Sequence, residues 1–383
     1  MSPSTGSRRR LRDGWRACLL VFLAARVGLS LLSVIAVGLM DPLPPVDVPG
    51  RAGPAATPGW HNAIDATERQ DAVWYLRLAE EGWSADDASA AFFPLYPLAV
   101  RIVSWVLPGD DVLAALLVSN VACFLALLAL FALTAEAFGD RVARRAIVVA
   151  AVFPTAFFLL APYGESLFLF LSVMTFREAR HGRWGSVALF GALASLTRSV
   201  GILLVPALLI EAIARRTDRV GIARVGGALA VGLGPLLWFA WWGVAHGRWL
   251  APLDAQANWQ RVVSWPWGTI ADAAELGWRF GSYWLLDLSI VSIAIVGLAV
   301  ATPVLRWSER AYGWLSLLLP LTLPFPGRPL LSMPRFVLVV FPVLWGLAGA
   351  NARREIPQPL VIAVLAGGWT LCAALFVNWL HLF

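Results

Sequence analysis

One acidic residue, Asp71, stands in a charged and aromatic stretch, "ERQDAVWYLRLAEEGW" at residues 68–83, between long apolar segments. Wound as a helix at about 100° per residue, this stretch places Asp71 on one face with Trp74 and Tyr75 and turns Arg77 away. A carboxylate held against aromatic rings at a membrane edge is partly desolvated, which raises its affinity for a proton. The pattern favours a general base for a sugar hydroxyl, with the rings as a platform for the sugar.

Other ionisable residues interrupt the apolar segments. Glu165 in "PYGESLF" and Arg198 in "LTRSVG" are either a structural ion pair or a site in which the arginine binds phosphate oxygens. Arg335 in "SMPRFVLVVFP" and Arg101 are either phosphate ligands or anchors that reach the membrane interface. Asp71 also has a simpler interpretation, as an acid that stabilises the start of a helix.

Composition indicates the class of protein. The 383 residues are 59% hydrophobic and 14% charged, whereas soluble domains carry about 25% charged residues. We therefore expect an all-α polytopic membrane protein with a single domain over residues 1–383. All 30 basic residues are arginine, and they cluster between apolar segments. The net charge is +6. Because the arginines lie between apolar segments, this positive charge indicates membrane topology and not nucleic-acid binding.

The arginine clusters predict how the chain crosses the membrane. They lie at residues 8–12, 141–145, 177–183, 215–224, 306–310 and 353–354. If all are cytoplasmic, an even number of crossings of about 20 residues separates each from the next. Clear spans are expected near 15–40, 111–138, 223–245, 284–305 and 358–380, with a closer pair at 312–326 and 331–348.

Two middle segments, 146–176 and 184–214, are each one long span or a hairpin of two short helices. The positive-inside pattern favours hairpins with tips at "PYGES" and "LTRSV", which gives about eleven crossings, with nine as the alternative. Residues 41–110 then form a first external loop with interfacial helices. Residues 246–283 form a second external loop, rich in tryptophan.

Several signatures are missing from the sequence. It has no glycine-rich nucleotide loop and no HExxH motif, and its three cysteines fit no metal-binding spacing. If the protein transfers a sugar, the donor must therefore be carried by a lipid. We expect neither a metal ion nor a cofactor to be required.

Five motifs in order carry a family resemblance: "DAVWYLRLAEEGW", "AFFPLYPLAVRI", "FPTAFFLLAPYGESLFLFLS", "GALASLTRSVGILL" and "PRFVLVVFP". Over about residues 65–345 they resemble the PIG-V family, which comprises the second mannosyltransferase of GPI-anchor assembly and bacterial homologues. The resemblance implies a GT-C-like bundle of about 9–11 transmembrane helices that uses a polyprenyl-phosphate sugar. It puts Asp71 at the catalytic-acid position, and the later motifs contain Tyr163, Glu165, Arg198 and Arg335.

The expected function is an inverting mannosyltransferase on the outer face of a bacterial inner membrane, which transfers mannose to a glycolipid or glycan acceptor. Asp71 is the expected catalytic residue. The expected donor-phosphate ligands are Arg198, Arg335 and Arg101, and the expected substrate pocket contains Trp74, Tyr75, Tyr163 and Glu165. Two alternatives stay open: a secondary transporter or lipid flippase, and a structural membrane subunit without activity.

Overall fold

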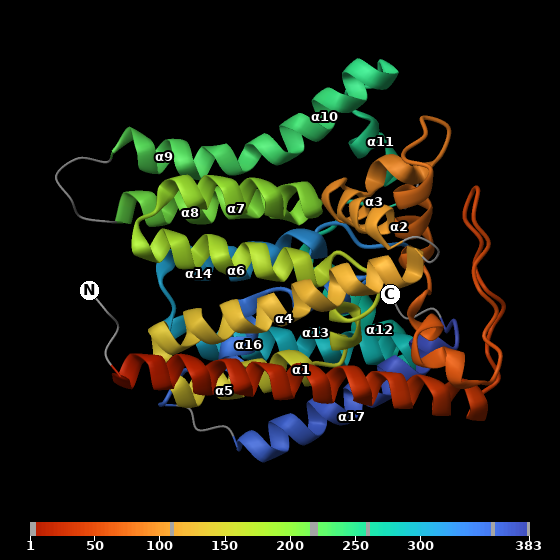
Figure 1. Ribbon diagram of the computed structural model, residues 1–383, viewed down its shortest axis with the longest axis horizontal. Helices are drawn as coiled ribbons and strands as arrows, with labels where there is room; N and C mark the ends of the chain where they lie inside the picture. The colour runs from red at the N-terminus through yellow and green to blue at the C-terminus, as the bar shows by residue number, and fades with distance from the viewer. Residues whose placement is uncertain (1–4, 108–110, 215–220, 258–260, 354–356, 381–383) are drawn as a thin grey trace.

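The protein is a bundle of helices, most of which run in roughly the same direction (Figure 1). The computed structural model describes residues 5–107, 111–214, 221–257, 261–353 and 357–380. Within these ranges the chain forms helices and two isolated β-bridges, with no β-strand. The expected all-α polytopic class is confirmed.

Within the described ranges, five helical segments are long and apolar enough to cross a membrane. They lie in α1 (Thr5–Leu39), in α4 (Asp111–Phe138), in α9 (Ile222–Leu229) continued by η6 (Ala230–Gly232) and α10 (Leu233–His246), in α13 (Ser282–Ala301) with η7 (Thr302–Val304), and in α17 (Gln358–Val377). These match the five clear spans expected from the sequence. The total of nine to eleven crossings stays a prediction, because the further crossings rest on shorter helices.

The two middle segments are hairpins, as the charge pattern favoured. The first is α5 (Asp140–Val152), η4 (Ala156–Leu159) and α6 (Glu165–His181), and the second is α7 (Trp184–Thr197), η5 (Ser199–Leu203) and α8 (Leu204–Ala214). Helix α5 ends because Phe153 precedes a proline and is extended, with ψ 142°. Helix α7 ends at the extended Arg198.

The later part of the chain contains α14 (Trp307–Leu321), α15 (Met333–Leu338) and α16 (Phe341–Leu347). Helix α16 packs directly on α13 through glycines, since a Cβ atom on Gly346 would lie 1.7 Å from the carbonyl oxygen of Gly297. The predicted span 331–348 is thus two short helices, broken at Val339 and Val340.

Both predicted external loops contain helices at one end of the bundle, which we call the cavity end (Figure 1). The first loop forms η1 (Trp60–Ala63), η2 (Asp65–Thr67), α2 (Asp71–Glu80), η3 (Ala88–Ala91) and α3 (Leu95–Val106). The second loop forms α11 (Ala251–Ala257) and α12 (Pro266–Phe280). The α4–α5, α6–α7 and α13–α14 connections, where arginines cluster, lie at the opposite end.

This arrangement predicts the outcome of cysteine labelling in intact cells. Asp86, in the first external loop, and Arg141, at the start of α5, are both exposed and lie at opposite ends. A membrane-impermeant maleimide should label Asp86→Cys and spare Arg141→Cys until the membrane is opened. The native cysteines Cys18, Cys123 and Cys372 are buried, so background labelling should be low. Labelling of Arg141→Cys alone would reverse the topology.

Candidate active site

A cavity of about 610 Å³ opens at the cavity end, between the first external loop, the tip of the second hairpin, Arg261 of the second loop and the segment from Phe325 to Phe336. Its polar and charged lining comes from Gln70, Asp71, Thr197, Arg198, Ser199, Arg261, Ser332 and Arg335. Its apolar and aromatic lining comes from Val46, Val48, Trp74, Tyr75, Ala91, Phe92, Phe93, Phe325, Leu331 and Phe336. A cavity of this kind, largely apolar with a few convergent polar groups, is typical of a ligand site.

Asp71 is the first residue of α2 and faces this cavity together with Trp74 and Tyr75. The expected helical face is therefore confirmed. Trp74 stacks on Phe92, with ring centroids 5.3 Å apart and an interplanar angle of 23°. Asp71 also occupies the first helical turn, where its charge interacts favourably with the helix dipole, so the simpler interpretation of this acid holds alongside the functional one.

The residue before Asp71 sets the entry into α2. Gln70 has φ 54° and ψ −120°, a conformation that is costly for a residue other than glycine. Its side-chain amide donates a hydrogen bond to the carbonyl oxygen of Leu380, 3.2 Å away, at the end of the chain. The strained turn is held by this distant contact, and it directs Asp71 into the cavity.

The charged residues of the hairpin tips reach Asp71 through a continuous chain of ion pairs. Arg335 Nη1 donates to Asp71 Oδ2 at 2.5 Å, and Arg335 Nε lies 3.2 Å from Glu165 Oε1. Arg198 donates from Nη1 to the same Glu165 oxygen. The order Asp71–Arg335–Glu165–Arg198 alternates negative and positive charges and joins α2, α15, α6 and the start of η5. We call these four residues the charge chain.

Burial makes the charge chain energetically important. Glu165 is fully buried, and Arg198 and Arg335 are each 9% exposed. A buried charge is very costly unless it is paired, so the predicted structural ion pair between Glu165 and Arg198 is real. Arg198 and Arg335 also line the cavity, however, whereas Glu165 does not. The acid is a support behind the two arginines, not part of the pocket surface.

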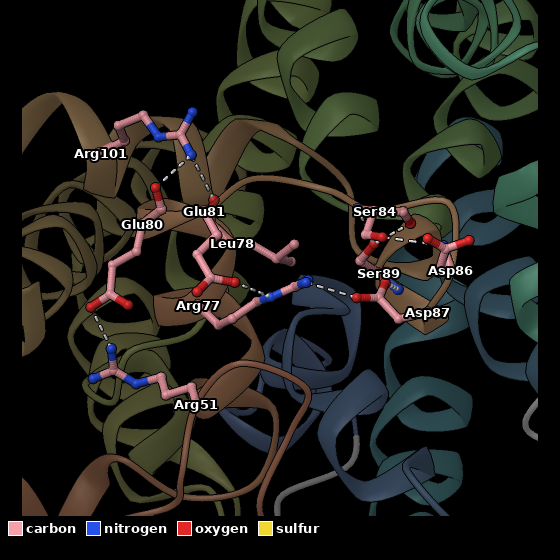
Figure 2. Close-up of polar contacts among 10 residues, drawn as sticks. All are labelled: Arg51, Arg77, Leu78, Glu80, Glu81, Ser84, Asp86, Asp87, Ser89 and Arg101. Atoms are coloured by element: carbon pink, nitrogen blue, oxygen red, sulfur yellow. Dashed lines mark hydrogen bonds and ion pairs between the residues drawn. The ribbon is translucent and has the colours of Figure 1, made fainter.

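Two predicted site residues lie elsewhere. Arg101 does not line the cavity, because its guanidinium donates to the carbonyl oxygens of Leu78, Ala79 and Glu80 at the end of α2 (Figure 2). It neutralises the negative end of that helix, and we remove it from the predicted phosphate ligands. Tyr163 is fully buried beneath the cavity, and its hydroxyl donates to the carbonyl oxygen of Arg69 at 2.8 Å.

The polar side of α2 is fixed by ion pairs (Figure 2). Arg77 lies 3.1 Å from Glu81 Oε2 and 2.8 Å from Asp87 Oδ2. Arg51 pairs with Glu80 at 2.5 Å, and it also pairs with Glu68. Burial raises the pKa of Glu68, although the nearby Arg51 opposes this shift. These contacts hold α2 from its outer side while Asp71 faces inward.

The C-terminal segment forms a second support, which no pattern in the sequence predicted. Arg69 Nε donates to the carbonyl oxygen of Val377 at 3.0 Å, and its guanidinium lies 5.0 Å from the ring centre of Trp379. Burial lowers the pKa of Arg69 to about 10. The indole of Trp379 donates to the carbonyl oxygen of Pro54. Contacts across more than 300 residues leave no local pattern from which to predict them.

Arg261 is a charged lining residue that the prediction missed. It stands in the tryptophan-rich second loop, where only the aromatic residues attracted interest. Among the described residues, no three His, Cys, Asp or Glu side chains gather as metal ligands. Independence from metal ions stays a prediction.

The charge chain predicts a large loss of stability when Glu165 is neutralised. Glu165→Gln leaves two buried guanidinium groups without their shared carboxylate, and breaking a buried ion pair costs about 3–5 kcal/mol. The control is Glu275→Gln, because Glu275 pairs with Arg279 on the surface of α12 with both side chains more than 60% exposed. That pair is worth about 0.3–0.5 kcal/mol. Equal free energies of unfolding for the two variants in detergent would contradict the role given to Glu165.

Comparison with known proteins finds a family model that matches part of the chain. Residues 56–217 match the family model described as Mannosyltransferase (PIG-V). GPI alpha-1,6-mannosyltransferase 2 of Mus musculus is 35% identical over 156 residues, which cover 36% of this chain and 30% of the relative. The Rattus norvegicus protein of the same name is 36% identical over 163 residues, covering 38% of this chain and 32% of that one. The match thus spans about a third of the length of these relatives.

The fold has a solved counterpart. The structure of ArnT from Cupriavidus metallidurans, bound to undecaprenyl phosphate, superimposes with a TM-score of 0.51 at 14% identity. The superposition covers 95% of this chain and 76% of ArnT. At this identity the likeness concerns the fold alone. The chain therefore shares the fold of ArnT, and its residues 56–217, which contain the first four of the five motifs, are similar to the PIG-V mannosyltransferase family.

Proposed function

We propose that the protein is an inverting mannosyltransferase, which moves mannose from a polyprenyl-phosphate-mannose donor to a glycolipid or glycan acceptor. The observation that carries this proposal is a carboxylate, Asp71, paired with Arg335 at the wall of a cavity that Arg198 also lines. The match of residues 56–217 to the PIG-V family supports the reaction class. A basic composition of arginine alone suggests a bacterial inner membrane. The arginine clusters at the opposite end of the bundle support a cavity on its outer face.

In this mechanism Asp71 is the general base. An acceptor hydroxyl gives its proton to the carboxylate while its oxygen attacks the anomeric carbon of the donor sugar. The bond from that carbon to the phosphate oxygen breaks, and its electron pair leaves with the lipid phosphate. Because attack and departure occur on opposite faces of the carbon, the new glycosidic bond has the inverted configuration. The proton on Asp71 is then lost to water.

The ion pair with Arg335 orients this base. Asp71 Oδ2 accepts the hydrogen bond from Arg335 Nη1 at 2.5 Å, which leaves Oδ1 as the oxygen that we assign to the acceptor hydroxyl. The sequence suggested an acid held against aromatic rings, and in the structure this acid also has the guanidinium of Arg335 as a direct partner. This ion pair fixes the position of the base, and a fixed position contributes to catalysis.

The departing phosphate needs positive charge around it. Arg198 and Arg335 both line the cavity, and preorganised cations next to a developing negative charge are often the largest contribution to catalysis. The stacked rings of Trp74 and Phe92 form a flat apolar surface beside Asp71, which suits the apolar face of a sugar. We propose that these side chains suffice without a metal ion, so transfer should continue in the presence of EDTA.

The direct experiment incubates purified protein with radiolabelled polyprenyl-phosphate-mannose and a membrane lipid extract. A labelled product whose glycosidic bond is opposite in configuration to that of the donor supports the proposal. Retained configuration would reject the single-displacement mechanism. If proteoliposomes move the lipid donor across the bilayer without transferring its sugar, the flippase alternative would replace the transferase.

The proposal predicts the effect of removing the base. Asp71→Asn keeps the shape of the side chain but cannot accept the proton. General-base catalysis contributes about 10²–10⁴-fold, so turnover should fall by roughly that factor while the KM for the donor changes little. Asp86→Asn, an exposed acid in the same external loop, is the control and should keep normal turnover. Near-normal turnover by Asp71→Asn would disprove the mechanism.

A further inference from the structure

The charges in and behind the cavity do not balance. Among the residues that the structure describes, three arginines line it: Arg198, Arg261 and Arg335. The two carboxylates of the site, Asp71 and Glu165, are both paired with Arg198 or Arg335. The positive charge of Arg261 is therefore the one that these acids leave uncompensated. A cavity with an excess positive charge attracts an anion.

The position of Arg261 is set by its backbone neighbours. The following residues pair with the segment after α14, because Val262 N donates to the Pro324 oxygen at 3.1 Å and Ser264 N donates to the Thr322 oxygen at 3.0 Å. Arg261 Nη1 donates to the carbonyl oxygen of Leu323 at 2.8 Å. A guanidinium has five N–H donors in a planar fork, so this bond orients the group and leaves donors for a ligand.

The electrostatic surroundings of Arg261 favour an anionic ligand. Burial and the like charge of Arg335 lower the pKa of the Arg261 guanidinium. An anion bound between these two arginines removes their mutual repulsion. Arg198 and Arg335 are less suited to bind the anion without Arg261. To do so they would have to weaken their ion pairs with the buried Glu165.

We propose that Arg261 binds the phosphate group of the lipid-linked donor and stays with that phosphate as it leaves. This inference rests on the proposed function. It assigns recognition of the donor's negatively charged phosphate to the second external loop. Phe325, two residues beyond the carbonyl group that holds Arg261, also lines the cavity and offers apolar surface to the start of the lipid chain. In the reaction, Arg335 then orients Asp71, and Arg261 neutralises the leaving group.

The test measures binding of polyprenyl phosphate, which carries no sugar, to the purified full-length protein. Charge-assisted hydrogen bonds contribute about 1.5–3 kcal/mol, so Arg261→Gln should raise the Kd about 10–100-fold. Arg261→Lys should recover part of the affinity, because it restores the charge without the fork. Arg279→Gln, on exposed α12, is the matched control and should bind normally. A Kd for Arg261→Gln within twofold of the wild-type value would overturn the inference.

A competition experiment identifies what Arg261 recognises. Inorganic phosphate that displaces the lipid from wild-type protein, but no longer from Arg261→Gln, indicates recognition of the phosphate group alone. If inorganic phosphate fails to compete while the lipid still requires Arg261, the bound species is the lipid phosphate as a whole. Equal competition in wild-type protein and Arg261→Gln would place the anion elsewhere and reject the inference.

The binding assay separates this inference from the proposed function. Wild-type protein that binds polyprenyl phosphate through Arg261 but transfers no mannose would reject the function and keep the phosphate site. Active wild-type protein with an unchanged donor KM in Arg261→Gln would reject the phosphate site alone. In Arg261→Gln we expect the donor KM to rise more than kcat falls. The melting temperature should not change, since the substitution removes only one hydrogen bond, to the carbonyl oxygen of Leu323.

Discussion

Glu165 is a carboxylate fully buried in a membrane bundle. A buried negative charge requires positively charged partners, and this requirement determines how the segments at the cavity end are arranged. One of its oxygens meets both Arg198 and Arg335, which belong to segments more than 130 residues apart. Because neither arginine can leave without exposing a buried charge, both hairpin tips are fixed relative to α15. Arg335 in turn fixes the position of Asp71 through their ion pair. The proposed base, Asp71, is thus positioned by a charge that does not line the cavity.

The remaining supports act on the same helix from other directions. The ion pairs of Arg77 hold the outer side of α2, and the C-terminal segment holds the strained turn before Asp71 through Gln70 and Arg69. Precise positioning of a base is worth several kcal/mol in catalysis, and such strain persists only where the surrounding structure fixes it. The cavity is therefore built on rigid parts, while its excess charge comes from the second external loop.

Local patterns predicted those parts of the site that follow from helix periodicity and from the high cost of charges among apolar residues. The shared face of Asp71, Trp74 and Tyr75 and the hairpin tips at Glu165 and Arg198 are of this kind. The sequence could not show that Arg101 turns back onto α2, that Tyr163 lies beneath the cavity, or that Arg261 enters it. Those positions depend on contacts between distant segments, and an arginine in a tryptophan-rich loop has the same local pattern whether it faces water or a ligand.

The most direct test of the account is a double-mutant cycle between Asp71 and Glu165, measured as turnover of folded protein. If Glu165 acts through Arg335 on the base, Glu165→Gln should lower turnover strongly in the wild-type background and have little further effect beside Asp71→Asn. Such non-additivity is the sign of residues that work as one unit. An equal loss from Glu165→Gln in both backgrounds would contradict the account, because the buried acid would then act independently of the base.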